Sequence, residues 1–308
     1  MRQDVTTDRP RVVVVVPCRN ERATVARCVA SLLAQEPAPD QVIVVDGGST
    51  DGSAELARAA GAEVVHHAGG TIAARRNAGV RAAGDAEVVG FLDADCEAHP
   101  GWLAAGLAAL RDADAVGNRL RAPDGAPWVA RRWSALESRL ARTDSPLWSA
   151  NLMVLREPFD TVGGFTESRR TAEDVDLSHK LRAAGARLAR APGMGATHHG
   201  FPGTLAAFVR RERWHASTPG WWAATSPRGR ALVATAGAWL VVGAAAGGSA
   251  ARRCSLRPAA AWLAASGAGV VALGAAAKGG RHAPADGAVL SAWALARLTR
   301  LATGLHRP

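Results

Sequence analysis

The sequence lacks any pair of cysteines close enough together to form a known motif. Its four cysteines, Cys18, Cys28, Cys96 and Cys254, are scattered over 308 residues without a C-x-x-C spacing. This pattern excludes a disulfide scaffold and a structural zinc site. It favours a reduced protein that faces the cytoplasm.

A long apolar run is also missing near the N-terminus. Residues 1–10 are polar and charged, and the run from Val12 to Val16 stops at Pro17, too short for a signal peptide. We therefore expect nothing that directs secretion. The chain as a whole is 48% apolar, which excludes a disordered or collagen-like protein and provides a core for one large domain or two small ones.

The excess of positive charge is confined to the C-terminal third. The net charge of the whole chain is +10. Residues 203–308 contain thirteen Lys and Arg residues and only two acidic residues, Glu212 and Asp286, so this part carries +11 and residues 1–202 carry −1. A nucleic-acid-binding protein needs this charge on its folded reading domain, so we exclude that class. A basic tail rich in Trp, Ala and Gly is more typical of a membrane-surface element.

Strands and helices alternate over the first 110 residues. Short runs of β-branched residues predict buried strands at 12–16, 42–45, 64–65 and 88–92, and helices are expected at 21–35, 51–60, 71–83 and 100–110. This order predicts an α/β fold with a mostly parallel sheet flanked by helices, which binds ligands at the carboxyl ends of its strands. The stretch 113–200 is less regular, with distinct segments at 148–155 and 173–184.

Two acidic clusters follow predicted strands. Asp46 ends the second strand and precedes two glycines and Ser49, an arrangement that suits the base and ribose of a nucleotide or, equally, a plain strand-to-helix turn. Asp93 and Asp95 leave the fourth strand one residue apart, where both can face a divalent cation. A D-x-D triplet is common by itself, and its position after a buried strand gives it weight.

The C-terminal third divides into three predicted parts. A basic, Trp-rich interfacial linker covers 203–230, and two uncharged segments, 231–251 and 258–277, are long enough to cross a bilayer. The alternative for these two is a hairpin of small-residue helices on a soluble domain or in a dimer. A final amphipathic helix lies at a membrane surface or caps a soluble core, with Trp293, Arg297 and Arg300 beside the apolar positions Leu290, Ala294, Leu298, Leu301 and Leu305.

Six motifs in order resemble those of family 2 glycosyltransferases, which have the glycosyltransferase-A fold. The resemblance covers about residues 11–200 and rests on 13–20, 44–52, 71–79, Asp93-Ala94-Asp95 followed by Pro100-Gly101-Trp102, 151–165 ending V-G-G-F, and 173–177. Any one of these motifs is weak, and six in register are specific.

The resemblance implies roles for individual residues. Asp46 corresponds to the nucleobase-binding aspartate, Asp93 lies near the ribose, and Asp95 ligates Mg²⁺ or Mn²⁺ on the diphosphate. Of the pair Glu173-Asp174 we take Asp174 as the catalytic base. Gly47 stands where many members have a second Asp. The remaining donor-binding candidates are Pro17, Arg19, Asn20, Glu21, Gly48, Ser49, Arg75, Asn77 and Ala94.

Two further places are assigned by similarity. A histidine near 198–199 completes the metal site in related folds; the sequence does not choose between His198 and His199, and we take His198. Arg213 and Trp214 resemble the end of the Q-x-x-R-W segment of processive synthases, with Arg210 replacing Gln, which puts processive polymerisation in doubt. They would contact the acceptor or the diphosphate, or else form an interfacial Trp/Arg belt.

Together these features predict an inverting, metal-dependent glycosyltransferase whose catalytic domain spans 1–202. A sugar, expected to be a hexose, would pass from a nucleotide donor to a lipid or cell-envelope acceptor at the cytoplasmic membrane face. One alternative is a membrane-anchored nucleotide-sugar binding or assembly protein without catalysis. Another, a sugar-phosphate nucleotidyltransferase, would need a Gly-rich loop where Pro17-Cys18-Arg19-Asn20 stands.

Overall fold

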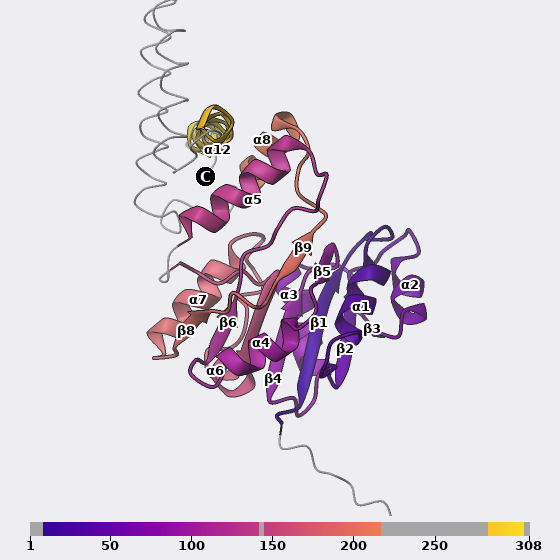
Figure 1. Cartoon of the computed structure of the whole chain (residues 1–308). Helices are drawn as coiled ribbons and strands as arrows, with labels where there is room; N and C mark the ends of the chain where they lie inside the picture. Colours follow the sequence, from indigo (N-terminus) through magenta and orange to yellow (C-terminus); the bar gives the residue numbers. More distant parts are fainter. Residues whose placement is uncertain (1–8, 142–144, 217–282, 305–308) are drawn as a thin grey trace, which may run out of the picture. The chain divides into compact units, whose positions relative to one another are not determined.

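A computed structural model of the chain describes residues 9–141, 145–216 and 283–304 (Figure 1). The chain forms two compact units, one of residues 1–121 with 142–200 and the other of residues 122–141 with 201–308. The expected catalytic domain at 1–202 ends close to this division. The segment 122–141 belongs to the second unit, although the residues before and after it belong to the first. The sequence did not indicate this excursion of the chain.

The first unit is built on a seven-stranded sheet with the order β3-β2-β1-β4-β7-β6-β8 (Figure 1). β7 alone runs antiparallel to its neighbours, so the sheet is mostly parallel, as predicted. The strands are β1 (Val12–Cys18), β2 (Gln41–Asp46), β3 (Glu63–His66), β4 (Val88–Leu92), β6 (Ala115–Gly117), β7 (Asn151–Leu155) and β8 (Leu188–Arg190).

Helices cover both faces of this sheet. The helices are α1 (Val25–Leu33), α2 (Ser53–Ala59), α3 (Ile72–Ala82), α4 (Trp102–Ala109), α6 (Arg156–Thr161) and α7 (Glu173–Ala183). Because β2 and β4 lie on opposite sides of β1, right-handed crossovers place α1 and α2 on one face and α3 on the other. A second, two-stranded sheet pairs β5 (Cys96–Ala98) with β9 (Ala196–His198).

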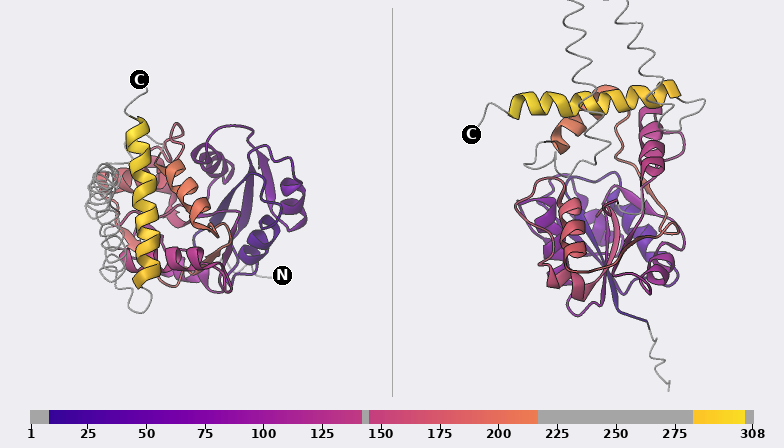
Figure 2. Two further views of the ribbon diagram at one scale, coloured as in Figure 1. Left: turned by 90° about the horizontal axis from the view of Figure 1, so that it is seen from above. Right: turned by 90° about the vertical axis from the view of Figure 1, so that its left-hand side faces the viewer.

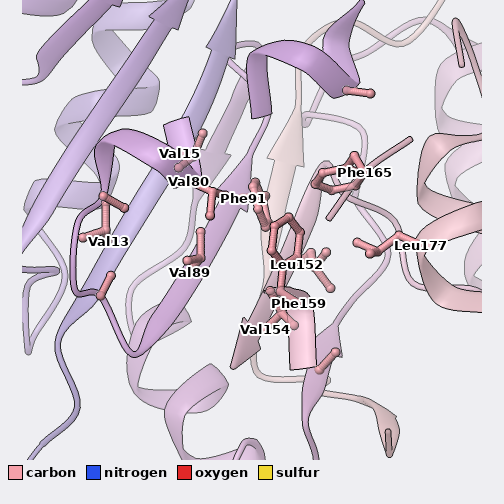
Figure 3. Packing of buried hydrophobic residues seen from close by; sticks show 14 of the residues in the cluster. Val13, Val15, Val80, Val89, Phe91, Leu152, Val154, Phe159, Phe165 and Leu177 are labelled. Carbon is pink, nitrogen blue, oxygen red and sulfur yellow. The ribbon is translucent and has the colours of Figure 1, made fainter. Parts of the chain in front are cut away.

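Alternate residues of the central strands form one apolar core with α3, α6 and α7. Figure 3 shows Val15 and Phe91 of neighbouring strands turned toward Val80, Phe159 and Phe165. Every residue of β1 is buried, as expected for a strand covered on both faces. Gly79 of α3 is required here because a Cβ at that position would overlap the side chain of Val15.

The topology gathers several loops at one edge of the sheet. β1, β2, β3, β4, β6 and β8 run in the same direction, so their carboxyl ends lie at the same edge. The antiparallel strand β7 begins there. Asp46, Asp93 and Asp95 therefore share this edge with the start of β7, as the predicted parallel sheet requires.

The second unit contains α5 (Trp128–Leu140), α8 (Leu205–His215) and α12 (Ala283–Gly304). Figure 2 shows α12, in yellow, lying across the other two helices. Leu290 and Ala294 of α12 are buried, and Leu290 packs with Trp133 and Phe208. These two positions of the predicted amphipathic face therefore cap a protein core, which was the alternative to a membrane surface; of the same face, the side chains of Leu298, Leu301 and Leu305 lie outside the description.

Among residues 9–141, 145–216 and 283–304, no helix combines the length and apolar character needed to cross a membrane. The two segments predicted to do so, 231–251 and 258–277, lie outside the described residues. The predicted linker 203–230 is described only as far as residue 216, and that part contains α8.

Candidate active site

The carboxylate of Asp46 is held by the turn that follows β2. It is buried, accepts hydrogen bonds from the backbone N–H groups of Gly48 (3.2 Å) and Ser49 (3.2 Å), and lies 3.4 Å from His66 Nδ1. Burial would raise the pKa of Asp46, but the hydrogen bonds from Ser49, Gly48 and His66 outweigh it and lower this pKa. Asp46 is thus an ionised acceptor fixed at the strand end.

Two loops are joined beside Asp46. The Asn20 backbone N–H donates to Ser49 Oγ (2.9 Å), and Asn20 Oδ1 accepts from the backbone N–H of Thr50 (2.9 Å). The Glu21 N–H donates to Ser53 Oγ (2.8 Å). Asn20 has a left-handed backbone (φ 58°), which its side-chain bond to Thr50 helps to offset. The loops after β1 and β2, which carry several of the residues predicted to bind the sugar donor, are therefore held together.

Arg75 and Asn77 have different surroundings on α3. The guanidinium of Arg75 lies against Gly47, where a Cβ would come within 2.9 Å of Arg75 Nη1. The pKa of Arg75 is lowered mainly by burial and, to a smaller extent, by the positive charge of the nearby Arg19. Asn77, by contrast, is bonded to the backbone of Phe165 through both ends of its amide (2.8 and 3.0 Å). Arg75 thus faces the strand-end loop, whereas Asn77 holds the loop before α7.

Arg76 joins the two acidic motifs. Its side chain is fully buried; Nη2 lies 2.6 Å from Asp93 Oδ1, and Nη1 lies 2.7 Å from Glu173 Oε1. Glu173, itself buried, is also 3.5 Å from Ser149 Oγ. One guanidinium therefore fixes a carboxylate after β4 and another at the start of α7. Arg76 lies inside the motif at 71–79 but was not among the predicted site residues, since its partners lie 17 and 97 residues away.

Asp174 is the carboxylate of the pair that remains available. Its Oδ1 accepts a hydrogen bond from the neighbouring Val175 N–H (2.7 Å), and the side chain is partly exposed. Burial, followed by the negative charge of Glu173, raises the pKa of Asp174 to about 7. A carboxylate with a pKa near neutrality suits a general base.

Asp95 meets a histidine from β9. Cys96 is opposite His198 in the β5–β9 register, and His198 Nε2 lies 3.0 Å from Asp95 Oδ2. His199 instead contacts Glu97 (3.2 Å). The structure therefore places His198, rather than its neighbour, at the predicted metal site. Gly200 packs directly against the carboxylate of Asp95, and a larger residue would not fit because its Cβ would overlap Asp95 Oδ2.

The donor atoms of Asp95, His198 and Cys96 lie within 4.8 Å of one another. Burial raises the pKa of the Cys96 thiol well above its usual range, so Cys96 stays protonated and is a poor ligand. The carboxylate suits Mn²⁺ or Mg²⁺, which complete their shells with phosphate oxygens and water, and the imidazole nitrogen makes the pair a better fit for Mn²⁺ than for Mg²⁺. The residues present therefore fit a divalent cation carried with a diphosphate.

The other predicted residues have varied environments. Pro17 is buried near the end of β1, Ala94 is buried two residues after β4, and Arg19 is exposed. Arg213 and Trp214 lie in α8 of the second unit, both exposed, so their contact with an acceptor or a membrane stays a prediction.

Comparison with known proteins agrees with this geometry. The family model "Glycosyl transferase family 2" matches residues 13–162. A pre-mycofactocin glycosyltransferase of Mycobacterium tuberculosis is 33% identical over an alignment of 219 residues, which covers 61% of this chain and 44% of that relative. An uncharacterized glycosyltransferase of the same organism is 33% identical over 184 residues, 58% of this chain and 81% of the relative.

A solved structure shares the fold. The mannosyltransferase PcManGT of Pyrobaculum calidifontis, in complex with GDP-Man and Mn²⁺, matches 95% of this chain and 88% of its own, with a TM-score of 0.59 and 24% identity. The similarity supports a glycosyltransferase-A-like α/β architecture. This chain spans less than half the length of the mycofactocin relative.

Proposed function

The chain belongs to glycosyltransferase family 2, and on that basis we propose that it transfers a sugar from a nucleoside-diphosphate sugar to an acceptor hydroxyl, with inversion at the anomeric carbon. The observation that carries the proposal is the linkage of the two acidic motifs through buried Arg76, which leaves Asp174 as a base with a pKa of about 7. The mannosyltransferase PcManGT was solved with a nucleotide sugar and Mn²⁺, which supports the same ligand class here.

Each part of the site has a role in this reaction. Asp46 accepts hydrogen bonds from the nucleobase, and Arg75 lies where the negative diphosphate is expected. Asp95 and His198 would hold Mg²⁺ or Mn²⁺, which supplies Lewis-acid stabilisation of the departing diphosphate. Asp174 takes the proton from the acceptor hydroxyl. Because Glu173 is held by Arg76, a single free carboxylate serves as base and the acceptor attacks directly, which inverts the configuration.

We further propose that the reaction takes place at the cytoplasmic membrane face, with a lipid or cell-envelope glycan as acceptor. The support is in the sequence: residues 203–308 carry a net charge of +11, and 231–251 and 258–277 are two uncharged segments of bilayer-spanning length. Flotation of the full chain with anionic vesicles tests this part. The chain is expected to float and to resist extraction by 1 M salt, whereas release by salt alone would contradict a spanning segment.

Release of free nucleoside diphosphate tests the reaction. Full-length protein in detergent is incubated with UDP-, GDP- and dTDP-sugars and Mn²⁺ or Mg²⁺, and Asp95→Ala and Asp174→Asn are the comparison variants. We expect slow, metal-dependent release from one donor, lost in Asp95→Ala. Asp174→Asn should keep donor binding and lose transfer. Normal transfer by Asp174→Asn, or a product with retained configuration, would contradict the mechanism.

A further inference from the structure

A histidine on the strand beside β2 contacts the carboxylate of Asp46. β2 and β3 pair in parallel, and their register sets His66 opposite Asp46, each at the end of its strand. His66 Nδ1 lies 3.4 Å from Asp46 Oδ2, and the next backbone N–H, that of His67, donates to the Asp46 carbonyl oxygen (2.8 Å). The strand pairing therefore holds this imidazole beside the carboxylate.

The tautomer of His66 is fixed by Arg58 of α2. Arg58 Nη2 lies 2.6 Å from His66 Nε2. A guanidinium has only hydrogen-bond donors, so Nε2 accepts this bond and the ring proton lies on Nδ1, the nitrogen that faces Asp46. The imidazole therefore donates to the carboxylate. Arg58, His66 and Asp46 form a chain of hydrogen bonds with one direction, from α2 through β3 to the end of β2.

Two elements hold the carboxylate of Asp46. The backbone N–H groups of Gly48 and Ser49 bind it from its own turn, and His66 binds it from β3. The outer torsion of an aspartate has no sharp minima, so its hydrogen bonds determine the plane of the carboxylate. The bond from His66 is also one of those that lower the pKa of Asp46 and keep it ionised. A donor outside the turn therefore contributes to both the orientation and the charge of Asp46.

The members of this chain differ in exposure. The side chain of Asp46 is 4% exposed, whereas that of His66 is 60% exposed, and Arg58 is exposed as well. Substitutions of His66 or Arg58 therefore remove hydrogen bonds and little core packing, so we expect the variants to fold. The effect of this chain on Asp46 can for that reason be measured separately from folding.

We propose that His66 is a positioning residue for the nucleobase of the sugar donor: held in one tautomer by Arg58, it orients the carboxylate of Asp46 toward the base. The inference rests on the proposed function, in which Asp46 accepts a hydrogen bond from the nucleobase. His66 acts through Asp46 and touches no reacting atom. Its loss therefore weakens the binding of the nucleoside part of the donor and leaves the chemical step unchanged.

Nitrogen NMR of the full-length protein in detergent tests the chain of hydrogen bonds without any nucleotide. The sequence contains nine histidines, and the His66 signals are those lost in His66→Asn. We expect Nδ1 to carry the proton of the neutral ring and Nε2 to carry none. In Arg58→Met the proton should move in part to Nε2, because nothing then imposes the acceptor role on that nitrogen. A wild-type ring protonated on Nε2 would reject the proposal.

Calorimetric titration with nucleoside diphosphates and Mn²⁺ tests the effect on Asp46. UDP, dTDP and GDP are the probes, because their bases carry a ring N–H that an acceptor-only carboxylate can bind. His66→Leu should bind the preferred nucleotide about tenfold more weakly, as outer-shell hydrogen bonds to a ligating side chain do at metal sites. His66→Asn should restore the affinity, since its amide N–H takes the place of Nδ1–H. His67→Leu, the neighbouring control, should bind as the wild type does.

Inorganic pyrophosphate with Mn²⁺ separates an effect on the base from a general loss of binding. Its affinity should be equal in the wild type and His66→Leu, and in transfer assays His66→Leu should raise the donor KM about tenfold and keep kcat. A matching loss of pyrophosphate affinity, or an unchanged nucleotide affinity in His66→Leu, would reject the positioning role alone. A wild-type protein that binds none of the nucleotides would reject the proposed function and this inference together.

Discussion

A single buried guanidinium, that of Arg76, supports two carboxylates from separate motifs. Asp93 and Glu173 are both positioned by it, and its own charge is acceptable in the core only because they neutralise it. Burial raises the pKa of Asp93, and the charge of Arg76 opposes that rise. Arg76 therefore links the loop after β4 to the start of α7, and under the proposed function it is a positioning residue.

Replacing Arg76 should reveal this linkage. Arg76→Met removes the counter-charge of the buried Glu173 and the partly buried Asp93, and we expect the free energy of unfolding to fall by about 3–5 kcal/mol. Urea denaturation measures the change. Arg81→Met is the control, since Arg81 makes only an exposed pair with Glu167 (3.3 Å) and should cost about 1 kcal/mol or less. Equal losses in the two variants would show that the buried pairs contribute little.

The ionisation of Asp174 should appear in the pH profile. A base works only when deprotonated, and its pKa is raised to about 7, so kcat/KM should fall as the pH drops through about 7. Asp174→Asn should lose about 10²–10⁴-fold in kcat and retain donor affinity. Rates of transfer between pH 5 and 9 provide the measurement. A wild-type profile that stays flat down to pH 5 would assign the proton transfer to another group.

At the scale of elements, the proposed metal site depends on two three-residue strands. β5 follows Asp95 directly, and its register with β9 brings His198 beside that carboxylate while His199 is directed to Glu97. A slip of one residue in this pairing would exchange the two histidines. The short second sheet therefore determines which of the two histidines lies beside Asp95.

Neighbouring histidine variants test this selection. His198→Ala should weaken Mn²⁺ binding by at least about tenfold, because a direct ligand is lost and outer-shell changes alone reach that size. His199→Ala should bind Mn²⁺ as the wild type does. Titration of Mn²⁺ followed by electron paramagnetic resonance reports both affinities. Weaker binding in His199→Ala alone would place the ion on the other side of β9.

At the scale of the whole molecule, α12 is attached to α5 by a buried charge. Asp286 is fully buried, and its two oxygens lie 2.6 Å from Arg132 Nε and 2.6 Å from Arg139 Nη2. Burial would raise the pKa of Asp286, but the hydrogen bonds and charges of both arginines lower it. This carboxylate therefore stabilises the second unit above its unfolded pKa of about 3.9, and that stability is lost as the pH falls through the lower folded value.

Neutralising Asp286 should loosen the second unit selectively. In Asp286→Asn two arginines lose their counter-charge, and we expect the local stability of α12 to fall by about 3–5 kcal/mol. Hydrogen exchange should show faster exchange in α5 and α12, with the amides of β1 to β4 unchanged. Uniform acceleration throughout the chain would contradict a separate second unit.

The first half of the sheet and its acidic strand ends could be predicted because each strand is one continuous run of apolar, mostly β-branched residues. The pairing of Arg76 with Glu173 could not, because nothing local relates residues 97 positions apart. The three-residue strand β9 is likewise too short to show a period. Leu290 and Ala294 have the spacing of an apolar helix face, which is the same whether lipid or protein covers it.

The assignment of α5 to the second unit has a practical consequence for anyone who isolates the first unit by itself. Expression of residues 1–200 alone would retain Val129, Trp133 and Leu136 of α5 but remove Phe208 and Leu290, the side chains that cover them. Such a fragment would expose the apolar face of α5 to solvent, and we expect it to aggregate. Joining residue 121 to residue 142 through a short flexible linker, with α5 deleted, is the better design for a soluble minimal fragment.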